Sequence, residues 1–150
     1  MTHDVLQHEP SFHDDCIYAI RLISPEPDRD DWRSELVLEI DHILKWVKGD
    51  GGRYRFVLVQ ANLCFENVSG LRVSFSFSEF SLIPLPIDRI ERSTEPVKVH
   101  GDQYREFSWI IYLNDRAGGL LTFRSTGYHL EKVGKPAEFE EQTIPKHQRI

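Results

Sequence analysis

Two stretches of the chain carry residues that could bind a metal ion or move a proton. The first is "SFHDDCIYAI" at residues 11–20, where a histidine, two aspartates and a cysteine stand directly before an apolar run. The second is "ELVLEIDHILKW" at residues 35–46, where an aspartate and a histidine follow an alternating segment. The candidate ligands are His13, Asp14, Asp15, Asp41 and His42. Imidazole and carboxylate groups bind divalent ions well, so these residues predict a metal site if the fold brings both stretches together.

A hairpin between the two stretches would bring them together. If even positions face the core on both strands, pairing Leu22 with Leu36 places Cys16 opposite His42. This register predicts two groups of candidate ligands. The inner group is Asp14, Cys16 and His42, and the outer group is His13, Asp15 and Asp41.

A simpler interpretation is that Asp14 and Asp15 only introduce the strand that follows them. Polar residues at such positions usually satisfy backbone groups of a turn. His42 is then an ordinary residue at a strand edge. The chain has no HExxH, paired CxxC or HxH spacing, and the long loop between the two strands leaves their register open. We favour the strand-start interpretation and keep the metal groups as its alternative.

Hydrophobic residues recur with a period of two along most of the chain. The clearest alternation lies in residues 35–42 and 71–80, and residues 16–23 are a further strand candidate. Turn signals separate about seven or eight such segments. This pattern predicts an all-β fold, either an antiparallel β-sandwich or an open barrel, with at most short helices.

Three segments depart from the alternation. Residues 86–93 resemble one or two helical turns, and residues 41–49 could be a short helix or a buried strand end. Near Gln60–Ala61 the apolar phase changes by one residue, which predicts a bulge or a tight bend.

The composition and charge limit the classes of function. The chain has a net charge of −6, and its lysines and arginines are scattered, which argues against nucleic-acid binding and is compatible with a basic partner. The sequence contains no apolar run of membrane-spanning length and no signal-peptide pattern, which predicts a cytoplasmic protein without a membrane partner. We expect one domain over residues 1–150, with peripheral tails at 1–11 and 134–150.

The remaining polar motifs have simple interpretations. Cys16 and Cys64 stand beside apolar residues in predicted strands, as buried free thiols do. His129 and Glu131 occupy alternate positions of "GYHLEK", which is typical of a solvated strand face. The chain contains no phosphate-binding loop, and we expect no cofactor.

Residues 81–103 are predicted to be a long connection that begins with an apolar, proline-containing run. The apolar residues at its start are Phe80, Leu82, Ile83, Leu85 and Ile87. We favour a role for this run as a lid over an open end of the core, because exposed apolar patches are uncommon on monomers. If the run is exposed, it is the first candidate for a protein interface or a homodimer contact.

Several motifs together resemble those of small uncharacterised bacterial all-β proteins, some of which are related in pattern to immunity proteins of toxin systems. In those proteins an early His–Asp pair introduces the first strand, and a Phe-x-(Asp/Asn)-Val turn precedes a later one. Phe12-His13-Asp14 and Phe65-Glu66-Asn67-Val68 hold these places here. The resemblance implies an all-β domain without an assigned activity and transfers no catalytic residue.

The sequence therefore supports two functional hypotheses. The first is a non-enzymatic cytoplasmic binding protein, such as an immunity-type inhibitor that covers a basic protein partner. The second is a small metal-dependent hydrolase that uses the His/Asp cluster at one end of the first hairpin. We favour the non-enzymatic hypothesis, since no motif establishes an active site.

Overall fold

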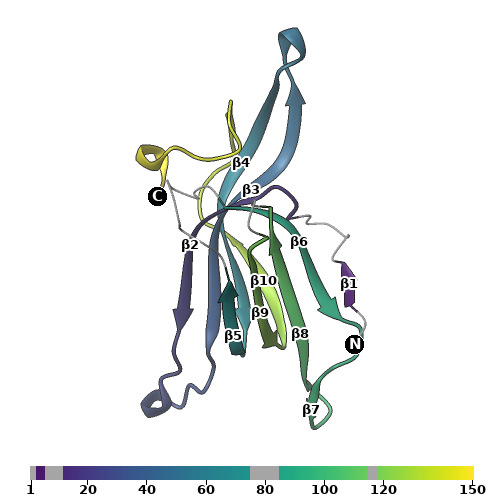
Figure 1. The fold of residues 1–150 in the computed structure, drawn as a ribbon. Coiled ribbons are helices and arrows are strands. Elements are labelled where there is room, and N and C mark those ends of the chain that lie inside the picture. The colour runs from purple at the N-terminus through teal and green to yellow at the C-terminus, as the bar shows by residue number, and fades with distance from the viewer. Residues whose placement is uncertain (1–2, 6–11, 75–84, 115–117) are drawn as a thin grey trace.

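The computed structural model describes residues 3–5, 12–74, 85–114 and 118–150 (Figure 1). Over these residues the protein is all-β, as predicted, and forms one antiparallel sheet of 11 strands. The strands are β1 (His3–Val5), β2 (Cys16–Ile23), β3 (Glu35–Lys48), β4 (Tyr54–Glu66), β5 (Ser69–Ser74), β6 (Leu85–Ser93), β7 (Lys98–His100), β8 (Tyr104–Leu113), β9 (Leu120–Ser125), β10 (Gly127–Lys132) and β11 (Ala137–Phe139). The described helices are the 3-10 turns η1 (Pro27–Arg29), η2 (Asp50–Gly52) and η3 (Lys146–Gln148), and none of them could cross a membrane.

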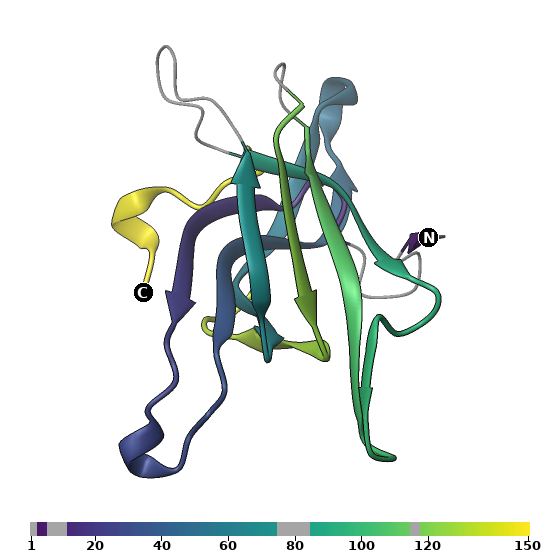
Figure 2. The same ribbon diagram turned by 60° about the horizontal axis from the view of Figure 1, so that its bottom comes forward.

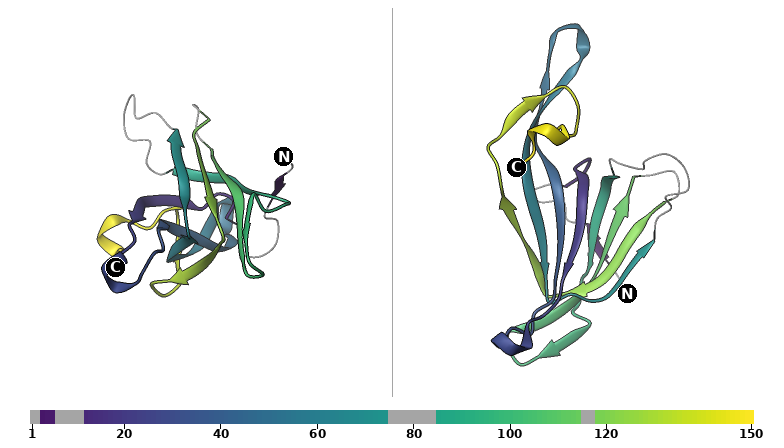
Figure 3. Two further views of the ribbon diagram at one scale, coloured as in Figure 1. Left: turned by 90° about the horizontal axis from the view of Figure 1, so that it is seen from below. Right: turned by 90° about the vertical axis from the view of Figure 1, so that its left-hand side faces the viewer.

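The sheet curls around one core without closing. Its strands follow the order β10-β4-β3-β2-β6-β8-β9-β5, with β1 on β6, β7 on β8 and β11 on β4. Strands far apart in this order nevertheless face each other, because the ring of Phe65 on β4 lies 4.8 Å from the ring of Phe123 on β9. Trp109 on β8 and Tyr128 on β10 are similarly close, at 5.9 Å. The architecture is therefore an open barrel, whose curvature is visible in Figures 2 and 3.

The two halves of β4 bury opposite faces of the sheet. Its C-terminal half directs Ala61, Leu63 and Phe65 into the main core inside the curl. Its N-terminal half directs Phe56 and Leu58 into a second cluster on the outer face. Because neighbouring residues of a strand point to opposite faces, this change of face shifts the apolar phase by one residue. The bulge predicted near Gln60–Ala61 is therefore absent, and β4 runs through it unbroken.

Register shifts occur instead in four other strands. The register shifts by one residue at Tyr18 in β2, at Leu44 in β3, between Ser69 and Arg72 in β5 and at Asp88 in β6. Each extra residue changes the facing of the side chains that follow it. The helical interpretation of 86–93 is therefore wrong, and residues 41–48 continue a strand.

The C-terminal segment, residues 134–150, is part of the fold and not a peripheral tail. Its β11 pairs with the first half of β4. Phe139 and Ile144 pack in the second cluster, on the outer face of β3 and β4. The prediction of a tail was wrong because the segment is polar apart from these two residues. Their two apolar contacts, together with a buried hydrogen bond from the Ile144 N–H to Asp41, hold the segment on the sheet.

The proposed apolar interface falls in two parts. Phe80, Leu82 and Ile83 lie outside the described residues. Leu85 and Ile87 begin β6 and are buried in the main core, so they are not available to a partner. The predicted long connection is also wrong within its described part, because it contains β6 and β7.

Candidate functional site

The bulge at Tyr18 changes which ligand candidates meet at the first hairpin. Leu22 pairs with Leu36, as the sequence predicted, but beyond the bulge Cys16 lies opposite Asp41 and not opposite His42. The two predicted groups therefore do not form. The structure instead separates their members among three local arrangements.

Asp15 and His42 form a buried pair inside the curl. His42 Nδ1 lies 2.6 Å from Asp15 Oδ2, and the Ile43 N–H donates to Asp15 Oδ1 at 2.9 Å. Burial raises the pKa of the Asp15 carboxyl, and this effect exceeds the lowering of the pKa by the hydrogen bond with His42. Both carboxylate oxygens are used, so the pair stabilises the start of β2 against β3 and leaves little capacity for a metal ion.

Asp41 faces the opposite side of β3 and holds the C-terminal segment. Its carboxylate accepts the Ile144 N–H at 2.9 Å and the Arg149 guanidinium at 2.6 Å. The side chains of Asp41 and Arg149 are only 3% and 6% exposed. The guanidinium also stacks on the Tyr18 ring, 3.7 Å from its centroid. Asp41 is therefore a structural anchor whose partners come from the other end of the chain.

His13 and Asp14 lie at the surface turn before β2. His13 Nδ1 is 2.7 Å from the backbone oxygen of Asp88, and this hydrogen bond is the main reason why the His13 pKa is raised. Asp14 adopts a left-handed conformation, and its N–H donates to the Ile87 carbonyl. The pair closes a turn against β6, in agreement with the interpretation of this stretch as the start of a strand.

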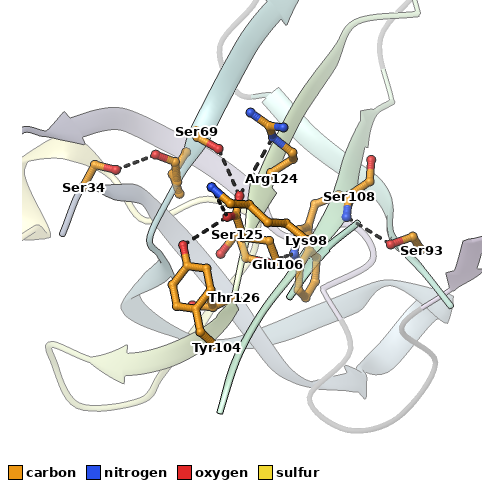
Figure 4. A network of polar contacts seen from close by, with 12 residues as sticks. Ser34, Ser69, Ser93, Lys98, Tyr104, Glu106, Ser108, Arg124, Ser125 and Thr126 are labelled. Atoms are coloured by element: carbon orange, nitrogen blue, oxygen red, sulfur yellow. Dashed lines mark hydrogen bonds and ion pairs between the residues drawn. The ribbon is translucent and has the colours of Figure 1, made fainter. Parts of the chain in front are cut away.

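A buried carboxylate that the sequence did not single out lies at the start of β8 (Figure 4). Glu106 accepts hydrogen bonds from Ser69 at 3.2 Å and from Tyr104 at 3.1 Å. Lys98 and Arg124 place their cations 3.8 and 3.9 Å from the same carboxylate. Burial raises the pKa of Tyr104, and its hydrogen bond to Glu106 acts in the same direction.

This polar network lines an open cavity of about 260 Å³, to which the exposed Trp32 also contributes. The Glu106 carboxylate is already satisfied by four neighbours, so the network primarily joins β5, β7, β8 and β9. Sequence reasoning missed it because β7 lay inside the predicted connection. Lys98 lies directly opposite Glu106 across β7 and β8, but this pairing can be recognised only once the strand register is known.

A second unusual surface lies on the outer face of β3, β4 and β10, beside the half covered by the C-terminal segment. It presents four glutamates, which we call the carboxylate face: Glu35, Glu39, Glu66 and Glu131. Glu35 lies directly opposite Glu66, and Glu39 and Glu131 flank Asn62 from either side. Among the described residues, Arg21 forms an ion pair with one of them, at 3.8 Å from Glu39.

Three possible metal ligands gather at the centre of this face. The ligand atoms of Cys64, His129 and Glu131 lie within 4.8 Å of one another, and within the described ranges this is the one cluster of three such donors. Cys64 was predicted to be a buried thiol, and it is buried. His129 and Glu131 were predicted to lie on a solvated strand face, and both are exposed. The position of these two residues beside Cys64 was not predicted.

Comparison of the chain with models of known protein families, with curated proteins and with solved structures gives no match.

Proposed function

We propose that this chain is a non-enzymatic binding protein whose carboxylate face receives the basic surface of a protein partner. The observation that carries the proposal is the concentration of four glutamates, each at least partly exposed, on one sheet face, with Glu35 directly opposite Glu66. Like charges at directly opposed positions of a sheet destabilise it. A partner that brings positive charge to this face relieves that repulsion as it binds.

The face also offers an apolar contact. Ile23 of β2 pairs with Glu35 and is 41% exposed, so an apolar side chain stands at the edge of the carboxylates. Protein interfaces combine buried apolar contacts with charged groups that steer the encounter and select the partner. The net charge of −6 adds long-range attraction for a basic protein.

Binding accounts for the polar residues better than catalysis does. Two buried carboxylates, Asp15 beside His42 and Glu106 among its four neighbours, use their oxygens within the fold. The cavity beside Glu106 is lined by other residues than Asp15 and His42. The two free cysteines suit a reducing compartment, which fits a cytoplasmic inhibitor of the immunity type that the sequence resembles.

A charge-matched pair of variants tests the proposal. One variant carries Glu35→Gln and Glu39→Gln, and the control carries Glu140→Gln and Glu141→Gln in the C-terminal segment. Each removes two negative charges and changes the net charge from −6 to −4. The measurement is the affinity for a labelled oligoarginine peptide, at low and at high salt.

We expect the Glu35/Glu39 variant to bind the peptide roughly three- to tenfold more weakly at low salt, with little change in the control. High salt should weaken wild-type binding and reduce the difference between the variants. Equal losses in both variants would mean that only net charge matters, and would overturn the proposed surface. The same pair then applies to any partner captured from a lysate, which must be lost by the first variant and retained by the second.

A further inference from the structure

The register of β4 and β10 places three different metal donors on one face. His129 lies directly opposite Cys64, and Glu131 lies two residues further along β10, opposite Asn62. Residues at i and i+2 of a strand share a face, and directly opposed or diagonal pairs lie within reach of one another. The three ligand atoms are accordingly all within 4.8 Å of one another.

The donor set suits a zinc-like cation. Thiolate, imidazole and carboxylate are the three ligand types of zinc sites, and three protein ligands with one open position are the usual arrangement of a site that holds water. Zinc–ligand bond lengths in a tetrahedral site imply ligand–ligand separations of roughly 3.4–3.6 Å. His129 and Glu131 are exposed, so their side chains have room to adjust toward a bound ion.

A fourth residue already orients the imidazole. His129 Nδ1 lies 2.9 Å from Glu66 Oε1. A carboxylate that holds one ring nitrogen sets the tautomer and leaves the other nitrogen free to accept a metal, as in many zinc sites. The ring is thus positioned by β4, the strand that also carries Cys64.

The surrounding charge favours a cation. Glu35 and Glu66 lie directly opposite each other on this face, and Glu39 and Glu131 flank Asn62. Without a cation these carboxylates repel one another, and a bound divalent ion offsets that repulsion.

We propose that Cys64, His129 and Glu131 bind one zinc-like divalent cation, with Glu66 positioning His129 and water in the fourth place. The ion joins β4 to β10, which is the terminal strand in the sheet order. The site goes beyond the proposed partner binding, because its thiol and imidazole are not needed to attract a basic protein.

Cobalt(II) titration of the reduced, chelator-treated full chain tests the site, because cobalt replaces zinc and reports a bound thiolate by its absorption. We expect one cobalt per chain with a sulfur-to-cobalt charge-transfer band, and displacement of that band by zinc. The Cys64→Ser variant should lose the band, whereas Cys16→Ser, the matched control at the other buried cysteine, should keep it. Zinc should raise the Tm of the wild type and not that of Cys64→Ser.

Two further variants separate the roles of the residues. His129→Gln should weaken cobalt binding by at least the roughly 10- to 100-fold expected for loss of a supporting group, and Glu66→Gln should weaken it within that range while retaining the band. His129 is exposed, so its variant is expected to fold even if Cys64→Ser does not. The Tm and circular dichroism of each metal-free variant check the fold.

Three outcomes would overturn the site. They are a wild type without a thiolate band, a band that Cys64→Ser retains, and binding that Glu35→Gln with Glu39→Gln weakens as much as His129→Gln does. The last outcome would mean diffuse attraction to carboxylates. Oligoarginine binding by metal-free Cys64→Ser should stay at the wild-type level, so failure of the metal site is distinguishable from failure of the partner surface.

Discussion

The outer face of β3 and β4 has two halves, and carboxylates are buried in one half and exposed in the other. In the covered half, the C-terminal segment lies over the sheet and buries Asp41 together with Arg149 (Figures 1 and 3). In the open half, Glu35 and Glu39 of the same strand remain at least partly exposed. Asp41 and Glu39 are two residues apart and point to the same side.

The difference shows how burial determines what a polar residue can do. A buried charge must be paired and hydrogen-bonded, so Asp41 is fully used by Arg149 and by the Ile144 N–H. An exposed carboxylate is solvated and needs no partner within the protein. The covered half therefore contributes stability, and the open half has donors left for a metal ion or a basic partner.

The largest expected effect comes from breaking the covered half. Asp41→Ala leaves the buried Arg149 cation and the Ile144 N–H without their acceptor, and should cost about 3–5 kcal/mol of unfolding free energy. Urea denaturation measures it. Glu39→Gln is the matched control, since its pair with Arg21 is at the surface and should contribute less than about 1 kcal/mol. Similar losses in both variants would contradict the distinction between the two halves.

The next largest expected effect is a difference in stability between variants of two histidines that each lie beside a carboxylate. His42→Gln removes the buried partner of Asp15 and should cost about 1–3 kcal/mol. His129→Gln disturbs only an exposed pair with Glu66, and in metal-free protein should change stability by less than about 0.5 kcal/mol. Thermal and urea unfolding in the presence of a chelator test the pair. A larger loss for His129 than for His42 would show that β10 depends on that contact even without metal.

We expect Asp15 to have a smaller effect on the free energy of unfolding, and this effect depends on pH. Because the folded pKa of Asp15 lies above its ordinary value of 3.8, the folded protein binds this proton more tightly than the unfolded chain does. Its contribution to stability is full below pH 3.8 and is lost as the pH rises through the raised folded pKa. Asp15→Asn lacks this titration, so the stability of the wild type relative to the variant should decline over that window. Urea unfolding at a series of acidic pH values measures it, and a relative stability that increases with pH would reverse the assignment.

The smallest effect has the opposite sign. Glu35→Gln removes the repulsion from Glu66 directly across β3 and β4, and should stabilise the metal-free protein by about 0.2–1 kcal/mol at low salt. High salt should reduce this gain because it screens surface charges. Thermal unfolding at both ionic strengths tests it. A variant that is less stable than the wild type at low salt would show that Glu35 has an unrecognised stabilising contact.

Prediction from sequence succeeded where a strand keeps a regular alternation against one core. Residues 35–42 alternate in the sequence and form the first part of β3 without a register shift. The segment 86–93 failed because the bulge at Asp88 separates the buried Ile87 and Ile90 by three residues, a spacing that a helix also shows. A bulge is invisible in a local pattern when its neighbours across the sheet are unknown.

The candidate site illustrates the same limit. The sequence placed Cys64 in a strand and His129 with Glu131 on another strand, and all three were placed correctly. Nothing local states that β4 and β10 are neighbours or that Cys64 pairs with His129. The predicted His/Asp groups failed for the complementary reason, since one extra residue at Tyr18 moved Cys16 from His42 to Asp41.

The sequence by itself determined the all-β class, the strand at 16–23 and the alternation that sends Leu36, Leu38 and Ile40 inward, because these follow from residue type and a period of two. Only the tertiary structure decided the bulges, the strand order and the half of the outer face that is covered. The contact that covers it joins Asp41 to Arg149 across 108 residues. A buried charge is stable only when it is paired, and here its partner lies far away in the sequence. No local sequence pattern identifies such a partner.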